Sequence, residues 1–210
     1  ASAAAARPAA KVKCVSNKTG FARYSASGSC RPSEHRDRTA CSRGGSCVVG
    51  DLGPGRGRVF YAARTKQPWG RYLEAAPSTW ARTDGDPNLM WCSDVVTSVP
   101  GALGTGLGAG RSNSAAMVAA CTSDAAVVAT AYRGGGKADW YLPARDELRQ
   151  LFVHQRAVGP FIFHGYWSSS QYAPNQAWIQ DFYADYTPAP SDKSYANYVV
   201  TRSPWSTKTR

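Results

Sequence analysis

Apolar residues occur along the chain in short runs bounded by turn-forming residues, a pattern typical of β-strands. The first run of the main body is RVFYAA, which starts at Arg58, and RYLEAAP follows from Arg71. Three further runs, YWSSSQY, AWIQDFYAD and NYVVTR, lie near the C-terminal end and are separated by polar loops. The pattern predicts short strands connected by loops.

Two segments carry helix signals. Residues 112–121 follow the glycine-dense stretch GALGTGLGAGR, and their Ala and Val residues suit a helix with Ser or Asn at its N-cap. Residues 143–154 begin with a proline, place Asp146 and Glu147 in the first turn and carry large apolar residues on one face. The glycine-dense stretch lacks the Gly-Lys-Ser/Thr ending of a phosphate loop, so we interpret it as a structural turn. Two helices among short strands predict an α+β fold with an antiparallel sheet.

The N-terminal part of the chain shows a different pattern. Residues 11–35 predict a small hairpin, with strands at Val12–Val15 and Phe21–Tyr24 around an Asn-Lys-Thr-Gly turn. Residues 36–52 are rich in Arg and Gly and predict a basic linker or loop.

The two ends complete the predicted organisation. Residues 1–10, ASAAAARPAA, have neither a charged n-region nor an apolar h-region, which fits a flexible mature N-terminus left after signal-peptide cleavage. Residues 53–205 are predicted to form one domain, and residues 206–210 a basic tail.

Six cysteines indicate an oxidising compartment. Their number is even, and they form neither Cys-x-x-Cys pairs nor clusters with His, which favours disulfides over a zinc site. Proximity along the chain favours the pairs Cys14–Cys30, Cys41–Cys47 and Cys92–Cys121, although other pairings are open. The first pair would staple the hairpin, which has almost no core of its own. We therefore expect a secreted or cell-surface, extracellular protein.

Composition agrees with strands and turns. The chain has 20 Gly, 13 Pro, 7 Trp, 11 Tyr and 6 Phe against 2 Met, which disfavours a helical bundle. Its 210 residues are 43% apolar, enough for a packed core. No stretch approaches the roughly 20 apolar residues of a membrane span.

Basic charge is concentrated at the ends of the chain. The net charge is +11, and residues 1–58 hold eleven Lys or Arg against three acidic residues, whereas residues 59–200 are neutral. Guanidinium groups pair bidentately with sulfate and phosphate, so the basic N-terminal segment suits an anionic polymer; a solvated coil that aids solubility is the alternative. Nucleic acid is disfavoured as a partner, because no helix-turn-helix, zinc-finger or RRM-like motif is present.

Two phrases, DWYLPARDEL (Asp139 to Leu148) and YWSSSQYAPNQAWIQDF (Tyr166 to Phe182), resemble a known family. They are preceded, in the family's order, by GPGRGRVFY, YLEAAP, a Trp-Cys pair and GTGLGAGRSNS. Together, residues 53–202 are similar to the C-terminal domain of the Legionella collagen-like adhesins, a family distantly related to the formylglycine-generating enzyme fold and so to C-type-lectin-like domains.

This resemblance implies a C-type-lectin-like fold with short antiparallel strands, two helices and long loops, here preceded by the small disulfide-stapled hairpin. The family usually closes with a Val-Arg-Pro-Val-Arg-like strand, whereas this chain ends in YVVTRSPW, which leaves the pairing of the last strand open. The resemblance also implies a scaffold whose loops present a binding face, with glycan or glycosaminoglycan binding in some members and trimers in others.

Catalysis is not expected. Enzymes of the related fold use two reactive cysteines late in the chain, and no cysteine follows Cys121. His35, His154 and His164 lie outside metalloprotease and nucleophile-elbow motifs. Lectin-like folds often hold calcium, and the chain offers oxygen donors for it, but no EF-hand spacing or sugar-calcium motif is present. We therefore expect no cofactor, with calcium as the open alternative; its donors would be Asn175, Asp181 and Asp185.

We expect a non-enzymatic adhesin or ligand-binding domain that recognises anionic polysaccharide or another surface polymer. The alternative is a structural or tip subunit of a cell-surface appendage or virion, which binds neighbouring protein subunits as a homotrimer or larger assembly. The predicted ligand-binding loop face comprises Ser169, Ser170, Gln171, Tyr172, Asn175, Asp181 and Tyr183. The predicted anionic-polymer patch comprises Arg36, Arg38, Arg43, Arg56, Arg58 and Arg202.

The aromatic residues divide by their neighbours in the sequence. Those between apolar residues are expected in the core: Trp140, Tyr141, Trp167 and Trp178. Those among Ser, Asn, Asp and Gln suit either ordinary strands or a surface for glycan stacking or a protein partner: Tyr172, Tyr183, Tyr186, Tyr195 and Tyr198.

Overall fold

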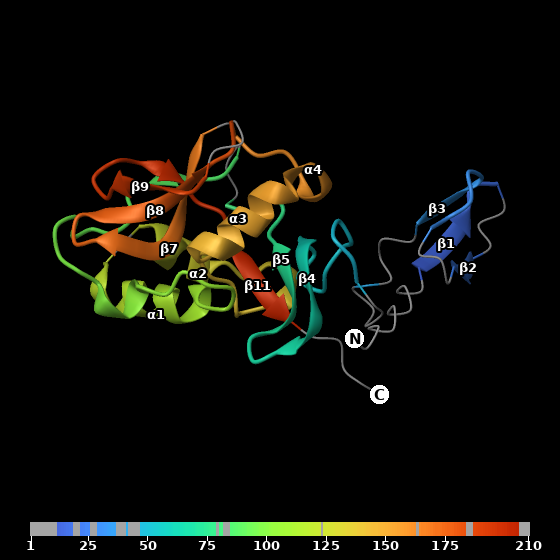
Figure 1. Cartoon of the computed structure of the whole chain (residues 1–210), viewed down its shortest axis with the longest axis horizontal. Coiled ribbons are helices and arrows are strands. Elements are labelled where there is room, and N and C mark those ends of the chain that lie inside the picture. The colour runs from blue at the N-terminus through green and yellow to red at the C-terminus, as the bar shows by residue number, and fades with distance from the viewer. Residues whose placement is uncertain are drawn as a thin grey trace, which may run out of the picture.

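A computed structural model describes most of the chain. The described residues are 12–18, 22–25, 29–36, 41, 47–78, 80–81, 85–122, 124–162, 164–183 and 187–205. The predicted flexible N-terminus (residues 1–10) and basic tail (residues 206–210) therefore lie outside the described residues, as do Arg38, Arg43, Asp185 and Tyr186. Figure 1 shows a mixed helix and sheet body with a small N-terminal sheet beside it, so the α+β class is confirmed.

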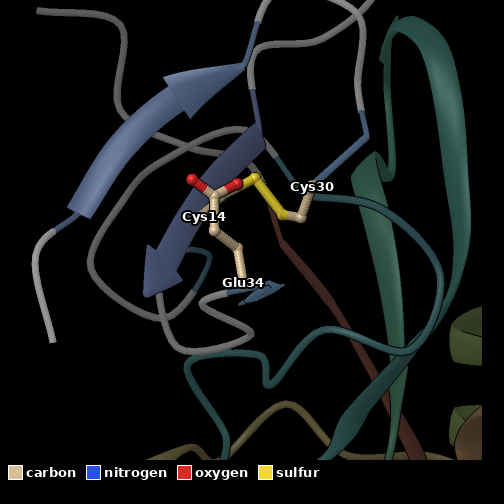
Figure 2. A group of neighbouring side chains, drawn as sticks. All are labelled: Cys14, Cys30 and Glu34. Atoms are coloured by element: carbon tan, nitrogen blue, oxygen red, sulfur yellow. A yellow bond between two sulfur atoms is a disulfide. The ribbon is translucent and has the colours of Figure 1, made fainter. Parts of the chain in front are cut away.

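The N-terminal sheet contains one strand more than the predicted hairpin. Its antiparallel strands lie in the order β2-β1-β3, with bounds β1 (Val12–Ser16), β2 (Ala22–Ser25) and β3 (Glu34–Arg36). The third strand has only three residues, and they lack the alternation of apolar and polar residues from which a strand could be predicted. The disulfide between Cys14 and Cys30 joins β1 to the segment that leads into β3 (Figure 2).

Two sheets form the body. The three-stranded sheet is antiparallel in the order β11-β5-β4, with bounds β4 (Arg58–Gln67), β5 (Gly70–Ala75) and β11 (Arg202–Trp205). The last strand, whose pairing the sequence left open, thus lies against β5. The five-stranded sheet has the order β6-β10-β7-β8-β9, with bounds β6 (Asn88–Leu89), β7 (Gly165–Ala173), β8 (Gln176–Asp181), β9 (Ala189–Asp192) and β10 (Asn197–Tyr198). Its pairs are antiparallel except β10 with β7.

Both predicted helices are present, together with two shorter ones. The four α-helices are α1 (Gly110–Ala120), α2 (Ala125–Ala131), α3 (Arg145–Val153) and α4 (Gln155–Val158). Short 3-10 turns lie at Pro100–Ala102 and Gly134–Gly136. The sequence of α2, AAVVATA, has no polar face that would mark helical periodicity, and α4 is a single turn. These features explain why the sequence predicted only two helices.

The core of the body is aromatic. One cluster packs Trp91, Trp140 and Trp167 with the alanines of α2, and a second packs the apolar face of α3 against Phe60, Leu73 and other residues. The core predictions are confirmed for Trp140, Tyr141 and Trp167. Trp178 is only partly buried, because it lies where β8 approaches its turn with β7.

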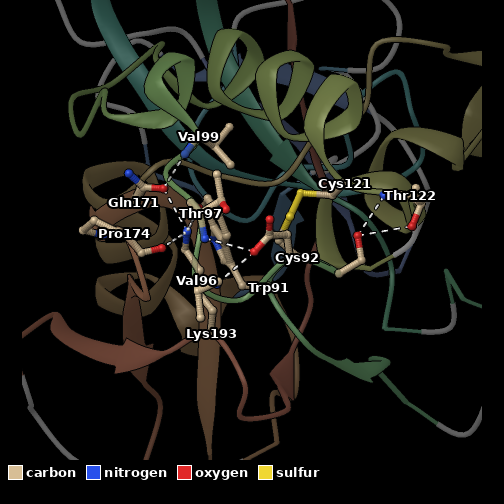
Figure 3. Close-up of a disulfide and its surroundings, with 12 residues drawn as sticks. Trp91, Cys92, Val96, Thr97, Val99, Cys121, Thr122, Gln171, Pro174 and Lys193 are labelled. Atoms are coloured by element: carbon tan, nitrogen blue, oxygen red, sulfur yellow. Dashed lines mark hydrogen bonds between the residues drawn. A yellow bond between two sulfur atoms is a disulfide. The ribbon is translucent and has the colours of Figure 1, made fainter.

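All three predicted disulfide pairs are formed: Cys14–Cys30, Cys41–Cys47 and Cys92–Cys121. The last of these joins the loop after β6 to the C-terminal end of α1 (Figure 3). Disulfides of this kind are typical of proteins that mature in an oxidising, extracellular environment.

A buried lysine fixes the loop beside the last disulfide. The Lys193 ammonium is inaccessible to water and donates to the carbonyls of Thr97 (3.0 Å) and Pro174 (2.6 Å) and to Gln171 Oε1 (2.9 Å). It also lies 4.4 Å from the centre of the Trp91 ring (Figure 3). Each of its three protons thus has an acceptor, which offsets the cost of burying the charge.

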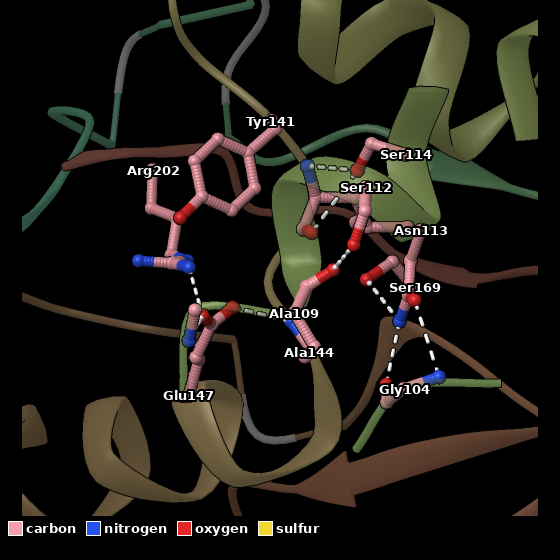
Figure 4. A network of polar contacts seen from close by, with 12 residues as sticks. Gly104, Ala109, Ser112, Asn113, Ser114, Tyr141, Ala144, Glu147, Ser169 and Arg202 are labelled. Atoms are coloured by element: carbon pink, nitrogen blue, oxygen red, sulfur yellow. Dashed lines mark hydrogen bonds and ion pairs between the residues drawn. The ribbon is translucent and has the colours of Figure 1, made fainter. Parts of the chain in front are cut away.

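The most deeply buried charges are Glu147 and Arg202, which form an ion pair with no exposed side-chain surface (Figure 4). Glu147 also accepts the N–H of Gly108 (2.5 Å) and of Ala144 (2.6 Å), the latter at the N-terminus of α3. The guanidinium of Arg202 lies 4.0 Å from the Tyr141 ring centre. One carboxylate therefore connects the loop before α1, the start of α3 and the last strand.

We predict that Arg202→Leu lowers the free energy of unfolding by about 3–5 kcal/mol, because it leaves the Glu147 carboxylate buried without its counter-charge. The double variant Arg202→Leu/Glu147→Gln should recover part of that loss. Urea unfolding measures all three proteins, and the exposed Arg111→Leu is the control, expected within about 0.5 kcal/mol of the parent. An Arg202→Leu protein as stable as the parent would show that the pair is dispensable.

Candidate functional site: an arginine groove

Three residues of the predicted loop face lie in the interior. Ser169 and Ser170 are fully buried and Gln171 is 4% exposed, all within β7. The Gln171 amide accepts from Val99 N (2.7 Å) and donates to Ser98 Oγ (2.8 Å). β7 contacts both α1 and α3, so its polar residues serve the structure and not an exposed face. This corrects the expected loop face for these three residues.

The serines join a polar network under α1. Asn113 of α1 bonds both backbone groups of Gly104, through Oδ1 at 3.2 Å and Nδ2 at 2.6 Å, and its Nδ2 reaches Ser169 Oγ at 3.4 Å (Figure 4). Ser170 Oγ donates to Gly104 O (2.7 Å) and accepts from Arg145 N (3.0 Å). The glycine-dense stretch is thus held as a structural turn.

The other four residues of the predicted loop face reach the surface. Tyr172 and Tyr183 are 52% and 73% exposed, and Asn175 and Asp181 also contact solvent. They do not form one site with the buried serines. Tyr195 is exposed as well, whereas Tyr198 is partly buried.

The predicted anionic-polymer patch is also divided. Arg202 is buried with Glu147, which excludes it from any surface patch. Arg36 pairs with the buried Asp51 at 2.9 Å and connects the N-terminal sheet to the body. Arg56 and Arg58 are the described members that line a hollow on the body.

Three adjoining hollows form what we call the arginine groove. The first, of about 240 Å³, is lined by Arg56, Arg58, Asp86, Pro160 and Phe161 among others. The second, of about 480 Å³, shares Pro160 and Phe161 with the first and adds Arg156, Phe182 and Tyr183. The third, also about 480 Å³, shares Arg156, Phe182 and Tyr183 with the second and adds Arg149 and Phe152.

The shared residues show that the groove is continuous from the loop before β4, past α4, to the end of α3. Four arginines line it, and Asp86 is the one acidic residue among the described residues of its walls. Arg149 lies 4.9 Å from the Phe152 ring centre. Within the described part of the chain, no hydrogen bond or ion pair engages the side chains of Arg56 or Arg156. The described walls of the groove therefore carry more basic than acidic side chains.

Asp86 adds little negative charge under mildly acidic conditions. Its carboxyl is 8% exposed and accepts from Trp80 Nε1 (2.7 Å) and Tyr166 Oη (2.8 Å). Burial raises the pKa of Asp86 to about 6 despite these two donors, because burial disfavours the charged form. Burial also raises the pKa of Tyr166, so this phenol remains protonated as a donor.

The loop that carries Arg56 is folded around a second buried carboxyl. Glu74 accepts the N–H of Gly55 at 2.9 and 3.1 Å, and a side chain at Gly53 or Gly55 would collide with it. Arg56 itself has φ +63°, a left-handed conformation that costs energy for any residue but glycine and is often found at functional sites. Burial raises the pKa of Glu74 to about 7, an effect that the Gly55 N–H and the Lys137 charge oppose.

The described residues contain one group of three potential metal ligands, Cys14, Cys30 and Glu34 (Figure 2). Both sulfur atoms are consumed in the disulfide, so the group is not suited to hold a metal. Of the oxygen donors proposed for calcium, Asp181 accepts the N–H of Tyr183 at 2.7 Å, and Asp185 lies outside the described residues.

Sequence reasoning missed Arg149 and Arg156. The signal was present, because Arg145, Arg149 and Arg156 recur at helical spacing on the polar side of the predicted helix and beyond it. The apolar face of this helix and the basic charge at the ends of the chain are more prominent features of the sequence than the spacing of these arginines.

No protein-family model and no curated protein matches this chain. No single helix in the described ranges is long and apolar enough to cross a membrane, although α1 and α2, bent by 113°, pass the length and composition test together.

We predict that the protein is more stable at pH 5 than at pH 8. Glu74 and Asp86 have folded pKa values above their usual ones, so the folded state binds more protons than the unfolded chain between about pH 4 and 7. Their contribution to stability is full below this window and is lost as the pH rises through it. Glu74 alone should account for about 2 kcal/mol between pH 5 and 8.

Urea unfolding of the parent and of Glu74→Gln at pH 5, 6, 7 and 8 measures this contribution. The variant should show a flatter pH dependence. Equal slopes for the two proteins would rule out a raised Glu74 pKa. The series stops at pH 8 because burial lowers the pKa of Lys193 to about 8, so its titration, which the parent and the variant share, contributes increasingly at higher pH.

Proposed function

We propose that this protein is a non-enzymatic binding protein that holds an anionic glycan in the arginine groove. The observation that carries the proposal is the groove itself, whose described walls combine four arginines with four aromatic rings and a single carboxyl, that of Asp86. A guanidinium binds sulfate or carboxylate through two parallel hydrogen bonds, and an aromatic ring packs against the apolar face of a sugar. An extended groove with repeated elements of both kinds suits a polymer.

The wider assignment rests on the resemblance of residues 53–202 to the adhesin domain. The two longer helices α1 and α3, the short and mostly antiparallel strands and the long connections support a C-type-lectin-like fold, and the three disulfides support an extracellular location. A role in adhesion to a glycan-bearing surface follows from these features taken with the groove.

The test is binding to immobilised heparin, with uncharged dextran as the comparison, across a salt series. We expect heparin binding that weakens steeply with salt and little binding to dextran. Arg149→Ala/Arg156→Ala should lower the affinity for heparin about tenfold or more, since two charge-assisted contacts are removed.

The matched control is Arg64→Ala/Arg111→Ala, which removes the same charge from exposed positions outside the groove. It should change the affinity by less than about threefold, as expected for screened charges at a distance. Equal losses in the two double variants would show that net charge alone drives binding. Absence of heparin binding at low salt, together with a stable oligomer in light scattering, would favour a structural subunit instead.

A further inference from the structure

A second arrangement of arginine and aromatic rings lies at the N-terminal end of α3. The groove reaches the C-terminal half of the same helix. The guanidinium of Arg145 lies 5.1 Å from the centre of the Trp178 ring, and Tyr172 meets the same indole edge-on, with centroids 4.9 Å apart and planes at 81°. We call these three residues the Trp178 platform. Tyr172, half exposed, contributes its ring to the surface.

The platform is held in one geometry. Arg145 Nε donates to Asp146 at 2.8 Å, and its backbone N–H is bound by Ser170 Oγ at 3.0 Å. Among the described residues, nothing accepts a hydrogen bond from the two Nη groups of Arg145, which leaves them available to a ligand. A guanidinium fixed in this way loses less conformational entropy on binding than a free one.

The platform continues the line of the groove. Arg145 and Arg149 are four residues apart on α3, so they lie on the same helix face, and Arg149 lines the third hollow. Both guanidinium groups lie over aromatic rings, Trp178 and Phe152 respectively. α3 packs on β8, whose residues include Trp178, and α4 packs against β4 (Figure 1).

On the basis of the proposed function, we infer that the Trp178 platform is a separate outer subsite for the same anionic glycan, reached only by a chain that extends along α3 beyond the arginine groove. Arg145 lies roughly 6 Å along α3 beyond Arg149, the groove residue nearest to it in the helix. A short oligosaccharide fills the groove without reaching the platform, whereas a longer one occupies both. Tyr172 would stack on a sugar ring while Arg145 holds its sulfate or carboxylate. The protein therefore selects ligands by chain length as well as by charge.

Size-fractionated heparin oligosaccharides test this inference. Titration calorimetry compares a tetrasaccharide with a dodecasaccharide on the parent protein and on Tyr172→Ala/Arg145→Ala. The matched control is Tyr195→Ala/Arg64→Ala, which removes one exposed tyrosine and one exposed arginine elsewhere. Near-ultraviolet circular dichroism confirms that each variant retains its tertiary packing.

We expect the platform variant to bind the dodecasaccharide about five- to tenfold more weakly than the parent, with the tetrasaccharide affinity unchanged within twofold. The control should leave both affinities within twofold. If both oligosaccharides lose affinity equally, or neither does, while Arg149→Ala/Arg156→Ala still lowers the affinity about tenfold or more, the platform is not an outer subsite and the groove proposal stands. If the parent binds neither oligosaccharide, the proposed function itself fails.

Discussion

The ion pair between Glu147 and Arg202 is closed to water on all sides, and three parts of the fold meet at it. Removing two charges from water is costly, so a buried pair persists only where further hydrogen bonds satisfy its atoms. Here the backbone N–H groups of Gly108 and Ala144 complete the carboxylate. These donors belong to the loop before α1 and to the start of α3. If either segment moved away, the buried Glu147 carboxylate would lose one of its hydrogen bonds.

This constraint fixes the helix that carries Arg149, one of the four arginines of the groove. α3 is held at its N-terminus by Glu147 and along its packed face by Leu148, Leu151 and Phe152. Arg145 and Arg149 lie at the edge of that packed face, half-buried, over the rings of Trp178 and Phe152. The groove is completed by a loop that a second buried carboxyl, Glu74, holds in place. Two buried carboxyl groups thus position the arginines of the groove. Glu147 holds the helix that carries Arg149, and Glu74 holds the loop that carries Arg56.

Local signals in the sequence predicted much of the fold. Proximity identified the disulfide partners, and the proline, the acidic first turn and the apolar face identified the helix that contains α3. The Ser-Ser-Ser-Gln run was predicted to lie on an exposed loop face. That prediction is wrong because α1 and α3 pack against β7, and the sequence of a polar strand does not indicate that other elements cover it. Arg202 was predicted to lie in a basic patch for a similar reason. Its neighbours in the sequence do not indicate that its ion-pair partner is the buried Glu147, 55 positions earlier in the chain. The groove could not be predicted, since it forms only where α3, α4 and the end of β8 meet.

β11 is the last strand of the described residues, and its first residue carries the counter-charge for a carboxylate in the middle of the body. During synthesis, the helix with Glu147 emerges well before its partner does. Until residues 202–205 have left the ribosome, the body holds an uncompensated acid and β5 lacks one neighbour. Closure of the body therefore waits for the segment that carries Arg202, although the residues around Glu147 and β5 are synthesised much earlier.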